Sequence, residues 1–349
     1  MNLNVVTNRK MKIAISDDYN FYFNLQTGYF ARWGRNYNDN PIFCPYGPEI
    51  LDIEVSTICS NNCEFCYKAN TKEGTNMTFE MFKNILDNMP PTVTQVAFGI
   101  GDLDSNPDLW KMMEYCRSME IIPNTTINGC HMGNGYYDKL SRLCGAVAVS
   151  LYNKDECYDT VHELSLQGLK QVNIHVLLAE ETFETCMQVL EDRKQDKRLK
   201  QMYATIFLWL KPKGKGNRYS QLTSIEKLRL LVRKALDAGE PFGFDSCGSL
   251  NFLEVVRGHQ HEKKLLKMID PCESTLFSYY INVEGRGFPC SFVEGEKGYQ
   301  GVDLLTIRDF VEEVWFSKET ERFRQELLLG EEGEKANCRT CPVYDLKCN

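Results

Sequence analysis

The sequence has no segment that resembles a membrane span or an export signal. None of its apolar runs approaches the roughly 20 residues that cross a bilayer as a helix. Its first residues, Met1 to Lys10, are mostly polar and do not form the apolar core of a signal peptide. We therefore expect a cytoplasmic protein, whose thiols are kept reduced.

Positive charge is outnumbered by negative charge, and histidine is scarce. The 40 lysines and arginines are outnumbered by 48 acidic residues, and the formal net charge is −8. Because nucleic-acid-binding surfaces neutralise phosphates with basic side chains, this balance disfavours a nucleic-acid partner. The chain has 5 histidines, and the one nearest to the first group of cysteines, His131, lies far along the sequence. A zinc site that combines those cysteines with a nearby histidine is therefore disfavoured.

Cysteine, in contrast, is abundant. The chain has 15 cysteines among 349 residues, with 43% hydrophobic and 25% charged residues as in an ordinary globular protein. It is long enough for one large domain with an appendage, or for two domains. Four cysteines lie in patterned segments and are expected to be buried as small hydrophobic residues: Cys116, Cys144, Cys157 and Cys186. Because nothing indicates export, metal or cluster ligation explains the remaining cysteines better than disulfides do.

Three cysteines are grouped in the stretch Cys59-Ser-Asn-Asn-Cys63-Glu-Phe-Cys66, with C-x3-C-x2-C spacing. Cysteine thiolates bind iron-sulfur clusters, and three of them in one loop can hold three corners of a four-iron cube. The fourth iron then has no protein ligand and is an open Lewis-acidic position for a small chelating molecule. Structural zinc and buried free thiols are the alternatives.

This spacing, with the aromatic Phe65 before its third cysteine, resembles the signature of the radical S-adenosylmethionine (SAM) enzymes. The resemblance implies that Cys59, Cys63 and Cys66 bind a catalytic 4Fe-4S cluster whose free iron chelates SAM. One electron then cleaves SAM to methionine and a 5'-deoxyadenosyl radical, which the protein directs at one substrate hydrogen. It also implies that Phe65 packs against the adenine.

From Glu49 onward, short apolar runs alternate with longer amphipathic ones. The predicted strands span residues 50–55, 95–100, 121–127, 146–151, 171–178 and 203–210. The predicted helices span residues 78–88, 107–119, 136–143, 155–167, 183–194 and 224–238. Six strand-helix units in series predict an α/β fold with a parallel sheet and right-handed crossovers. The periodicity leaves open a partial barrel or an open doubly wound sheet, and the resemblance implies a partial (βα)6 TIM-like barrel.

Polar residues follow the predicted strands at the edge where parallel sheets place their chemistry. The stretch Ile100-Gly101-Asp102 occupies the position at which the family carries a Gly-Gly-Glu-like motif that receives the SAM amino group. The resemblance implies that the SAM site is lined by Gly101, Asp102, Asn128 and Ser150. Each of these residues, taken alone, is equally compatible with a structural role.

A basic, glycine-interrupted loop with Lys211, Lys213 and Lys215 follows the sixth predicted strand. An ammonium group there suits a ligand carboxylate or phosphate, so Lys211 is a candidate SAM contact. A solvated loop with incidental charge is the alternative. His175 alternates with apolar residues in the fifth strand and is expected on the inner face, not as a base.

A second group of cysteines lies near the end of the chain. Cys272 and Cys290 flank a predicted hairpin with a turn near Gly285, and the ends of paired strands lie side by side. This unit and the later C-x2-C resemble the Twitch and SPASM extensions of radical SAM enzymes. The resemblance implies at least one auxiliary 4Fe-4S cluster, with these ligands: Cys272, Cys290, Cys338 and Cys341. Cys247 and Cys348 either complete a second cluster or are free thiols, and a four-cysteine zinc site is the alternative for the whole group.

The chain is expected to divide into an N-terminal segment (1–48), a partial barrel (49–240) and a cluster-binding extension (241–349). The N-terminal segment predicts a β-hairpin from 20–24 and 28–33, with Gly28 at the turn. It is too short and too poor in helix to resemble the peptide-recognition domain of many peptide-modifying relatives. A separate peptide-recognition protein is therefore a possible partner, beside an electron donor such as flavodoxin or ferredoxin.

The resemblance implies a radical SAM oxidoreductase that abstracts hydrogen from a C–H bond of its substrate. A ribosomally made peptide is the first candidate substrate, with oxidation or crosslinking as the outcome. A small molecule that undergoes dehydrogenation or rearrangement is the second. A non-catalytic protein with structural zinc is the alternative from another class.

Overall fold

The computed structural model describes the chain except residues 1–2, 215–216, 269–270, 297, 330–338 and 344–349. Parallel strands alternate with helices through its centre. The strands are β5 (Ile50–Glu54), β6 (Gln95–Gly99), β7 (Ile122–Ile127), β8 (Ala146–Ser150), β9 (Gln171–Leu178), β10 (Ala204–Trp209) and β11 (Phe242–Phe244). The intervening helices are α1 (Phe79–Asp87), α2 (Leu109–Ser118), α3 (Tyr136–Leu143), α4 (Lys154–Leu166), α5 (Phe183–Gln195) and α6 (Ile225–Ala238). The predicted parallel α/β sheet is confirmed.

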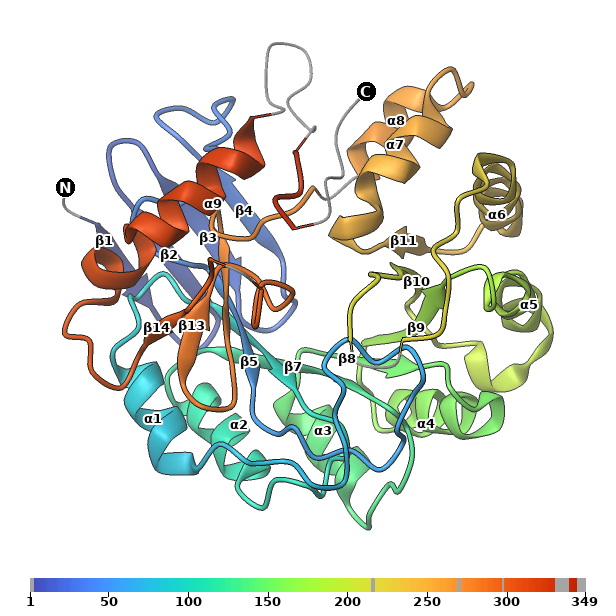
Figure 1. Ribbon diagram of the computed structural model, residues 1–349, viewed down its shortest axis with the longest axis horizontal. Helices are drawn as coiled ribbons and strands as arrows, with labels where there is room; N and C mark the ends of the chain where they lie inside the picture. The colour runs from blue at the N-terminus through green and yellow to red at the C-terminus, as the bar shows by residue number, and fades with distance from the viewer. Residues whose placement is uncertain (1–2, 215–216, 269–270, 297, 330–338, 344–349) are drawn as a thin grey trace.

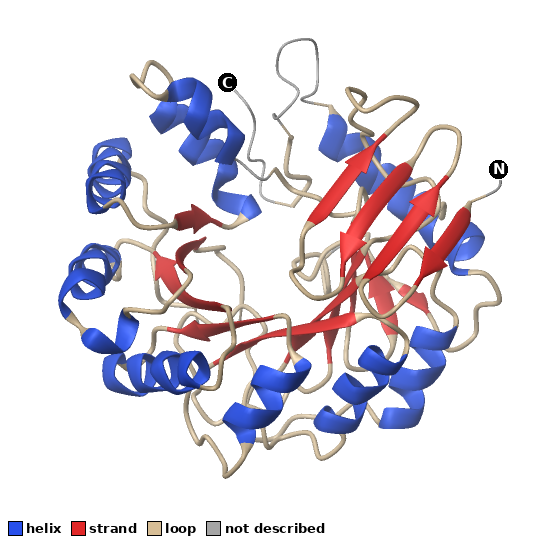
Figure 2. Ribbon diagram, turned by 180° about the vertical axis from the view of Figure 1, so that it is seen from behind, coloured by secondary structure: helices blue, strands red, loops and turns tan. Residues whose placement is uncertain are grey.

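The parallel strands form a curved sheet with the helices along its outer side (Figure 1 and Figure 2). The sheet has ten strands in the order β11-β10-β9-β8-β7-β6-β5-β12-β13-β14. The last three are β12 (Ser278–Ile281), β13 (Arg286–Phe288) and β14 (Val302–Asp303). Among the strands that the structure describes, β11 and β14 are the two ends of the sheet and do not pair with each other. The described strands therefore form an open sheet that does not close into a barrel. The six-unit partial barrel stays a prediction.

The two faces of the parallel strands differ in polarity, because alternate residues of a strand point to opposite sides. In β9, Val172, Ile174, Val176 and Leu178 are buried in the core shared with the helices. Asn173 and His175 lie on the inner face, and the register places His175 beside Ser150 of β8 and Ile206 of β10. In β5, Leu51 and Ile53 belong to the same core, which leaves Asp52 and Glu54 on the inner face.

The helices begin and end at residues suited to those positions. Thr78 precedes α1, and its side chain accepts a hydrogen bond from the Met81 N–H, which caps the start of the helix. Ser224 accepts in the same way from Lys227 at the start of α6, and Gly239 ends that helix with a left-handed φ of 73°. No helix in the described part of the chain is both long and apolar enough to span a membrane.

The extension beyond α6 continues the large sheet. It contains α7 (Ser249–Val256), α8 (Glu262–Leu265), a π-helical turn at Val311–Trp315 and α9 (Lys318–Leu328). Short 3-10 turns lie at Lys197–Leu199, Ser246–Gly248 and Leu266–Met268. The predicted hairpin is β12 and β13, which pair antiparallel, and β12 also pairs in parallel with β5. The hairpin with its flanking cysteines therefore lies directly beside the strand that leads into the Cys59 loop.

The N-terminal segment forms a four-stranded antiparallel sheet rather than a hairpin alone. Its strands are β1 (Asn4–Thr7), β2 (Met11–Ile15), β3 (Asn20–Asn24) and β4 (Phe30–Trp33). The predicted hairpin is β3 and β4, and two strands of weaker sequence pattern extend it. Phe21 and Phe23 are buried in a second core with Phe277 and Phe323 of the extension. The N-terminal sheet and the extension thus share one hydrophobic core.

Candidate cofactor site

The three grouped cysteines lie in the loop after β5, at the carboxyl end of the parallel sheet. Cys59, Cys63 and Cys66 are each partly buried, and none is in a disulfide bond. Burial, with smaller contributions from the neighbouring Cys59 and Cys66, raises the pKa of the Cys63 thiol to about 11, because burial disfavours a thiolate and thiolates repel one another. A cationic cluster would reverse this effect and hold the thiolates deprotonated. The three thiols therefore fit an iron-sulfur cluster.

Within the described residues, no three Cys, His, Asp or Glu side chains are grouped so that they could hold a single metal ion. The loop backbone is nevertheless held at several points. The Cys59 N–H donates to the Thr71 carbonyl at 2.8 Å, and the Cys66 N–H donates to the Cys63 carbonyl at 3.1 Å. Asn62 adopts a left-handed φ of 47°, which asparagine tolerates better than most residues.

Gly101 and Asp102, predicted to line the SAM site, lie directly against the cysteine loop. A Cβ on Gly101 would meet the Cys59 Cβ at 2.5 Å and the Ile58 carbonyl at 2.7 Å, so only glycine allows this approach. The buried Asp102 carboxylate accepts from the Ser60 N–H at 2.7 Å and from Asn128 Nδ2 at 2.8 Å. The structure therefore brings three of the predicted residues together around Cys59.

Phe65 and the end of β8 border a hollow of about 800 Å³ beside the same loop. The Phe65 ring lies 5.5 Å from the ring of Tyr152 and 5.1 Å from that of Tyr219, and all three residues line the hollow. Ser150 is buried at the end of β8, two residues before Tyr152. The volume and aromatic lining are suited to a nucleotide-sized ligand.

Lys211, the remaining predicted SAM contact, is occupied by another partner. Its ammonium group forms an ion pair with Asp245, whose carboxylate also accepts from the Trp209 and Gly248 N–H groups. Burial opposes the charge of Lys211, but Asp245 together with Cys247 and Cys290 outweighs burial, and the pKa of the lysine is raised. A contact of Lys211 with SAM would have to replace this pair. Lys215 lies outside the described residues.

Three cysteines of the extension, Cys247, Cys272 and Cys341, lie near enough to Cys290 to interact with it electrostatically. Burial raises the pKa of the Cys290 thiol to about 12, with smaller contributions from Cys272 and Cys341. Burial also raises the pKa of Cys247, whose neighbours include Cys272 and Cys290. The structure thus brings Cys247 beside the predicted ligands of the hairpin, which its position in the sequence left open. Cys338 and Cys348 lie outside the described residues.

The cysteines expected to be core residues are buried. Cys116, Cys144, Cys157 and Cys186 all lie in the large hydrophobic core. Burial raises the pKa of the Cys157 and Cys186 thiols to about 12, so these thiols stay protonated at neutral pH. This prediction is confirmed.

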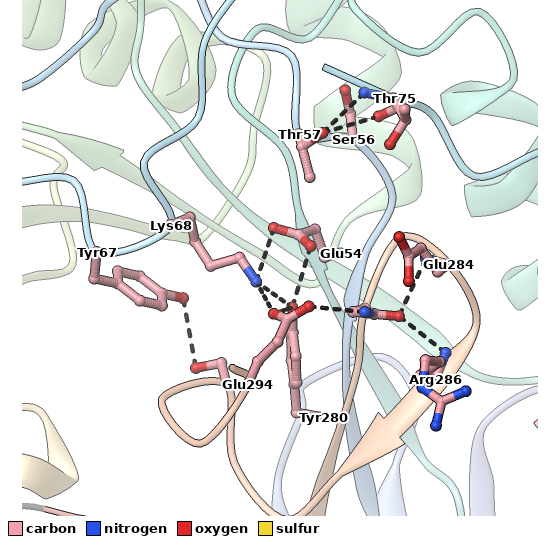
Figure 3. Close-up of polar contacts among 12 residues, drawn as sticks. Glu54, Ser56, Thr57, Tyr67, Lys68, Thr75, Tyr280, Glu284, Arg286 and Glu294 are labelled. Carbon is pink, nitrogen blue, oxygen red and sulfur yellow. Dashed lines mark hydrogen bonds and ion pairs between the residues drawn. The ribbon is translucent and has the colours of Figure 1, made fainter. Parts of the chain in front are cut away.

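A polar network that the sequence did not indicate joins the cysteine loop to the extension (Figure 3). Lys68 forms an ion pair with Glu54 of β5 at 3.2 Å and donates to the Tyr280 hydroxyl of β12 at 2.6 Å. It also pairs with Glu294, which accepts from Asn282 Nδ2 at 2.7 Å. The Tyr280 hydroxyl lies 3.2 Å from a carboxylate oxygen of Glu54 and equally far from one of Glu294. The network ties β5, the cysteine loop and the hairpin into one unit.

Two ionisable groups on the inner face, Asp52 and His175, had no functional role predicted from the sequence. Asp52 keeps contact with solvent, but protein surrounds it and burial raises the pKa of its carboxyl to about 6. Burial lowers the pKa of His175 to about 4, and Asp245 opposes that shift. At neutral pH Asp52 is mostly ionised and His175 is neutral. The one available signal for Asp52 was an acidic residue between the apolar Leu51 and Ile53.

A curved parallel sheet with a three-cysteine loop after its first strand is the fold of the radical SAM enzymes, and solved structures of that class match this chain. SuiB of Streptococcus suis bound to the precursor peptide SuiA is 12% identical; the match covers 99% of each chain with a TM-score of 0.71. SuiB bound to S-adenosylmethionine is 14% identical over 85% of this chain and 73% of that one, with a TM-score of 0.64.

The enzyme anSMEcpe with bound AdoMet is 17% identical over 86% of this chain and 89% of that one, with a TM-score of 0.58. No protein-family model and no curated protein matches the sequence. At these identities the likeness establishes the fold, which agrees with the resemblance that the cysteine motif indicated.

Proposed function

We propose that this chain is a radical SAM enzyme that abstracts hydrogen from a substrate C–H bond. The observation that carries the proposal is the packing of the Cys59 loop against Gly101 and Asp102 at the carboxyl end of the sheet. The three thiols of this loop would hold a 4Fe-4S cluster, which supplies one electron to split SAM into methionine and a 5'-deoxyadenosyl radical. The chain shares its fold with structures that contain bound SAM, and this likeness supports the same conclusion.

The residues around the loop would have different roles in holding the loop and in binding SAM. Asp102 holds the Ser60 N–H and Asn128, which fixes the loop next to β7. Phe65 and Tyr152 would contact the adenine in the hollow beside the loop. Ser150 is not among the residues that line this hollow, and it would face the ribose or carboxylate from the end of β8. The sheet with its outer helices keeps these groups on rigid elements, as a reaction with a reactive radical requires.

For the substrate, we propose a ribosomally made peptide that is oxidised or crosslinked. The match of the whole chain to SuiB in complex with its precursor peptide supports a peptide substrate. The extension cysteines Cys272, Cys290, Cys338 and Cys341 would hold an auxiliary cluster that accepts an electron, which makes a net oxidation the expected outcome. Cys247, which interacts electrostatically with Cys272 and Cys290, is a further candidate ligand. An electron donor of the flavodoxin or ferredoxin class would supply the electron to the catalytic cluster. A separate peptide-recognition protein would bind the peptide and bring it to the enzyme. A small-molecule substrate is the second candidate.

Formation of 5'-deoxyadenosine tests the proposed activity. We expect anaerobically reconstituted protein with dithionite to release 5'-deoxyadenosine from SAM, and a Cys59→Ala, Cys63→Ala, Cys66→Ala variant to release none, because the cluster has lost its ligands. A matched Cys116→Ala, Cys157→Ala variant removes two buried thiols and should retain the product. A colourless protein that binds zinc in place of iron and sulfide would exclude the proposal and favour a structural role.

Mass spectrometry tests the proposed substrate. A small peptide encoded next to this protein is co-expressed either with the native chain or with the three-cysteine variant. We expect a loss of two hydrogens, seen as a lower peptide mass, only with the native chain. An unchanged mass for every neighbouring peptide, together with 5'-deoxyadenosine formation, would favour a small-molecule substrate.

A further inference from the structure

Two aromatic rings connect the cysteine loop to the cysteines of the extension. Tyr67 directly follows Cys66, and Phe292 lies two residues after Cys290. Their ring centroids are 4.4 Å apart at an interplanar angle of 37°, which is among the closest ring contacts in the described part of the chain. Each ring thus belongs to the immediate surroundings of one cysteine site.

The contact is held from several sides. The Tyr67 hydroxyl lies 3.5 Å from the Ser291 hydroxyl, and the Phe292 N–H donates to Cys290 Sγ at 3.5 Å. The Lys213 ammonium donates to the carbonyl of Phe292.

The loop after β10 closes the same junction. The Lys211 ammonium lies 5.3 Å from the centre of the Phe292 ring. Gly214, with a φ of +103°, brings its Cα so close to the cysteine loop that a Cβ would meet the Cys66 carbonyl at 2.3 Å. Three segments far apart in the sequence therefore meet at the two rings.

We propose that the contact between the Tyr67 and Phe292 rings, here called the ring stack although the rings are tilted, couples the two cysteine sites electronically. Electron exchange between two buried centres falls steeply with the width of the non-bonded gap between them, and rings in contact reduce that gap to one van der Waals separation. The path runs from Cys290 through the chain to Phe292, across the stack to Tyr67, and through the chain to Cys66. The inference rests on the proposed function, because it needs an iron-sulfur cluster at each site.

The step is the transfer of a single electron. The reduced auxiliary cluster is oxidised by one electron and the oxidised catalytic cluster is reduced by one. No bond forms or breaks and no proton moves. The electron enters from a low-potential one-electron reductant, dithionite in the experiment and a protein of the flavodoxin or ferredoxin class in the cell.

Three variants of the full chain distinguish the effect of the two rings on electron transfer from the effect of the groups around them. Phe292→Leu removes one ring but keeps an apolar side chain and the N–H group that bonds Cys290. Tyr67→Phe keeps the stack and removes only the hydroxyl near Ser291. Phe316→Leu makes the same change as Phe292→Leu at a ring that packs against Phe43, away from both cysteine sites.

The experiment uses anaerobically loaded protein with measured iron and sulfide content. Less than one equivalent of dithionite is added, and freeze-quench EPR follows the redistribution of the electron between the two cluster signals. We expect fast redistribution in the native chain, Tyr67→Phe and Phe316→Leu, and its loss in Phe292→Leu. Redistribution at the native rate in a fully loaded Phe292→Leu protein would overturn the proposal.

Failure of the variant and failure of the proposed function give different results. If Phe292→Leu does not retain both clusters, Tyr67→Leu removes the other ring of the stack and makes the same test. A native chain with no iron-sulfur signal at the Cys59 loop would contradict the proposed function itself. A native chain loaded at both sites that releases 5'-deoxyadenosine but shows no redistribution would contradict only the coupling.

Discussion

A Gly101→Ala variant is expected to lose the iron bound at the Cys59 loop and, with it, the formation of 5'-deoxyadenosine. The added Cβ would lie 2.5 Å from the Cys59 Cβ and 2.7 Å from the Ile58 carbonyl, distances at which backbone must move. Overpacking of this kind costs roughly 1 to 3 kcal/mol. Because the displaced group carries a cluster ligand, the effect on iron binding should exceed the effect on stability. Iron content per chain and thermal unfolding of the apoprotein measure the two effects separately.

Gly99→Ala is the matched control for this change. Gly99 lies two residues earlier, at the end of β6, and its nearest neighbour would be the Glu54 Cα at 3.3 Å. Only a small adjustment is needed there, so this variant should keep its iron. Native iron content in Gly101→Ala would show that the loop has room beside β6, and would leave Gly101 with no role in holding Cys59.

A Lys68→Met variant is expected to lose about 3 to 5 kcal/mol of unfolding free energy, because it leaves a buried carboxylate without its cation. The side chain of Glu54 is only 6% exposed, and Lys68 is its ion-pair partner. Burial already raises the pKa of Glu54, while Lys68 lowers it. Removal of Lys68 therefore raises that pKa further. Urea unfolding of the apoprotein measures the loss.

The pH dependence of this loss follows from the sign of the shift. A carboxyl whose pKa is higher in the folded than in the unfolded chain stabilises the fold below the unfolded value, and this contribution disappears as pH rises through the folded value. The destabilisation by Lys68→Met should therefore be larger at pH 8 than at pH 5. An equal loss at both pH values would show that Glu54 is not the group responsible.

Two further variants complete the test. Lys68→Met with Glu54→Gln removes both charges and should recover much of the stability, since a neutral amide is less costly to bury than an unpaired carboxylate. Lys83→Met breaks an ion pair with Asp87 in which both side chains are well exposed, and it should leave the free energy nearly unchanged. A Lys83→Met loss as large as that of Lys68→Met would remove the distinction on which the prediction depends.

The alternation of strands and helices could be predicted because it is written in local periodicity. The even residues of β9 are apolar and line the core, while Asn173 and His175 face the other way, and this alternation is visible in the sequence. The grouping of Cys59, Cys63 and Cys66 was equally visible, because one short loop holds them all. Gly101 and Asp102 could be placed near that loop from the rule that parallel strands end at a common edge.

Pairings between distant segments could not be predicted in the same way. The parallel pairing of β12 with β5 joins residues more than 200 positions apart, and no local pattern specifies it. The N-terminal sheet was underestimated for a different reason: β1 and β2 are short, and β1 is largely exposed and pairs only with β2, so its sequence pattern is weak. Pairings between distant segments are determined by how much surface the whole folded chain buries, and a short stretch of sequence does not specify them.

The sequence by itself determined the class of the sheet, the position of the cysteine loop at its carboxyl edge and the identity of the core cysteines, because each depends on residues close together in the chain. Only the tertiary structure decided that Lys68 pairs with Glu54 and Glu294, that Cys247 lies beside Cys272 and Cys290, and that Tyr67 stacks on Phe292. Apart from the Lys68–Glu54 pair, these contacts join segments that are far apart in sequence. Their partners are set by how the extension packs on β5, which is a property of the whole fold.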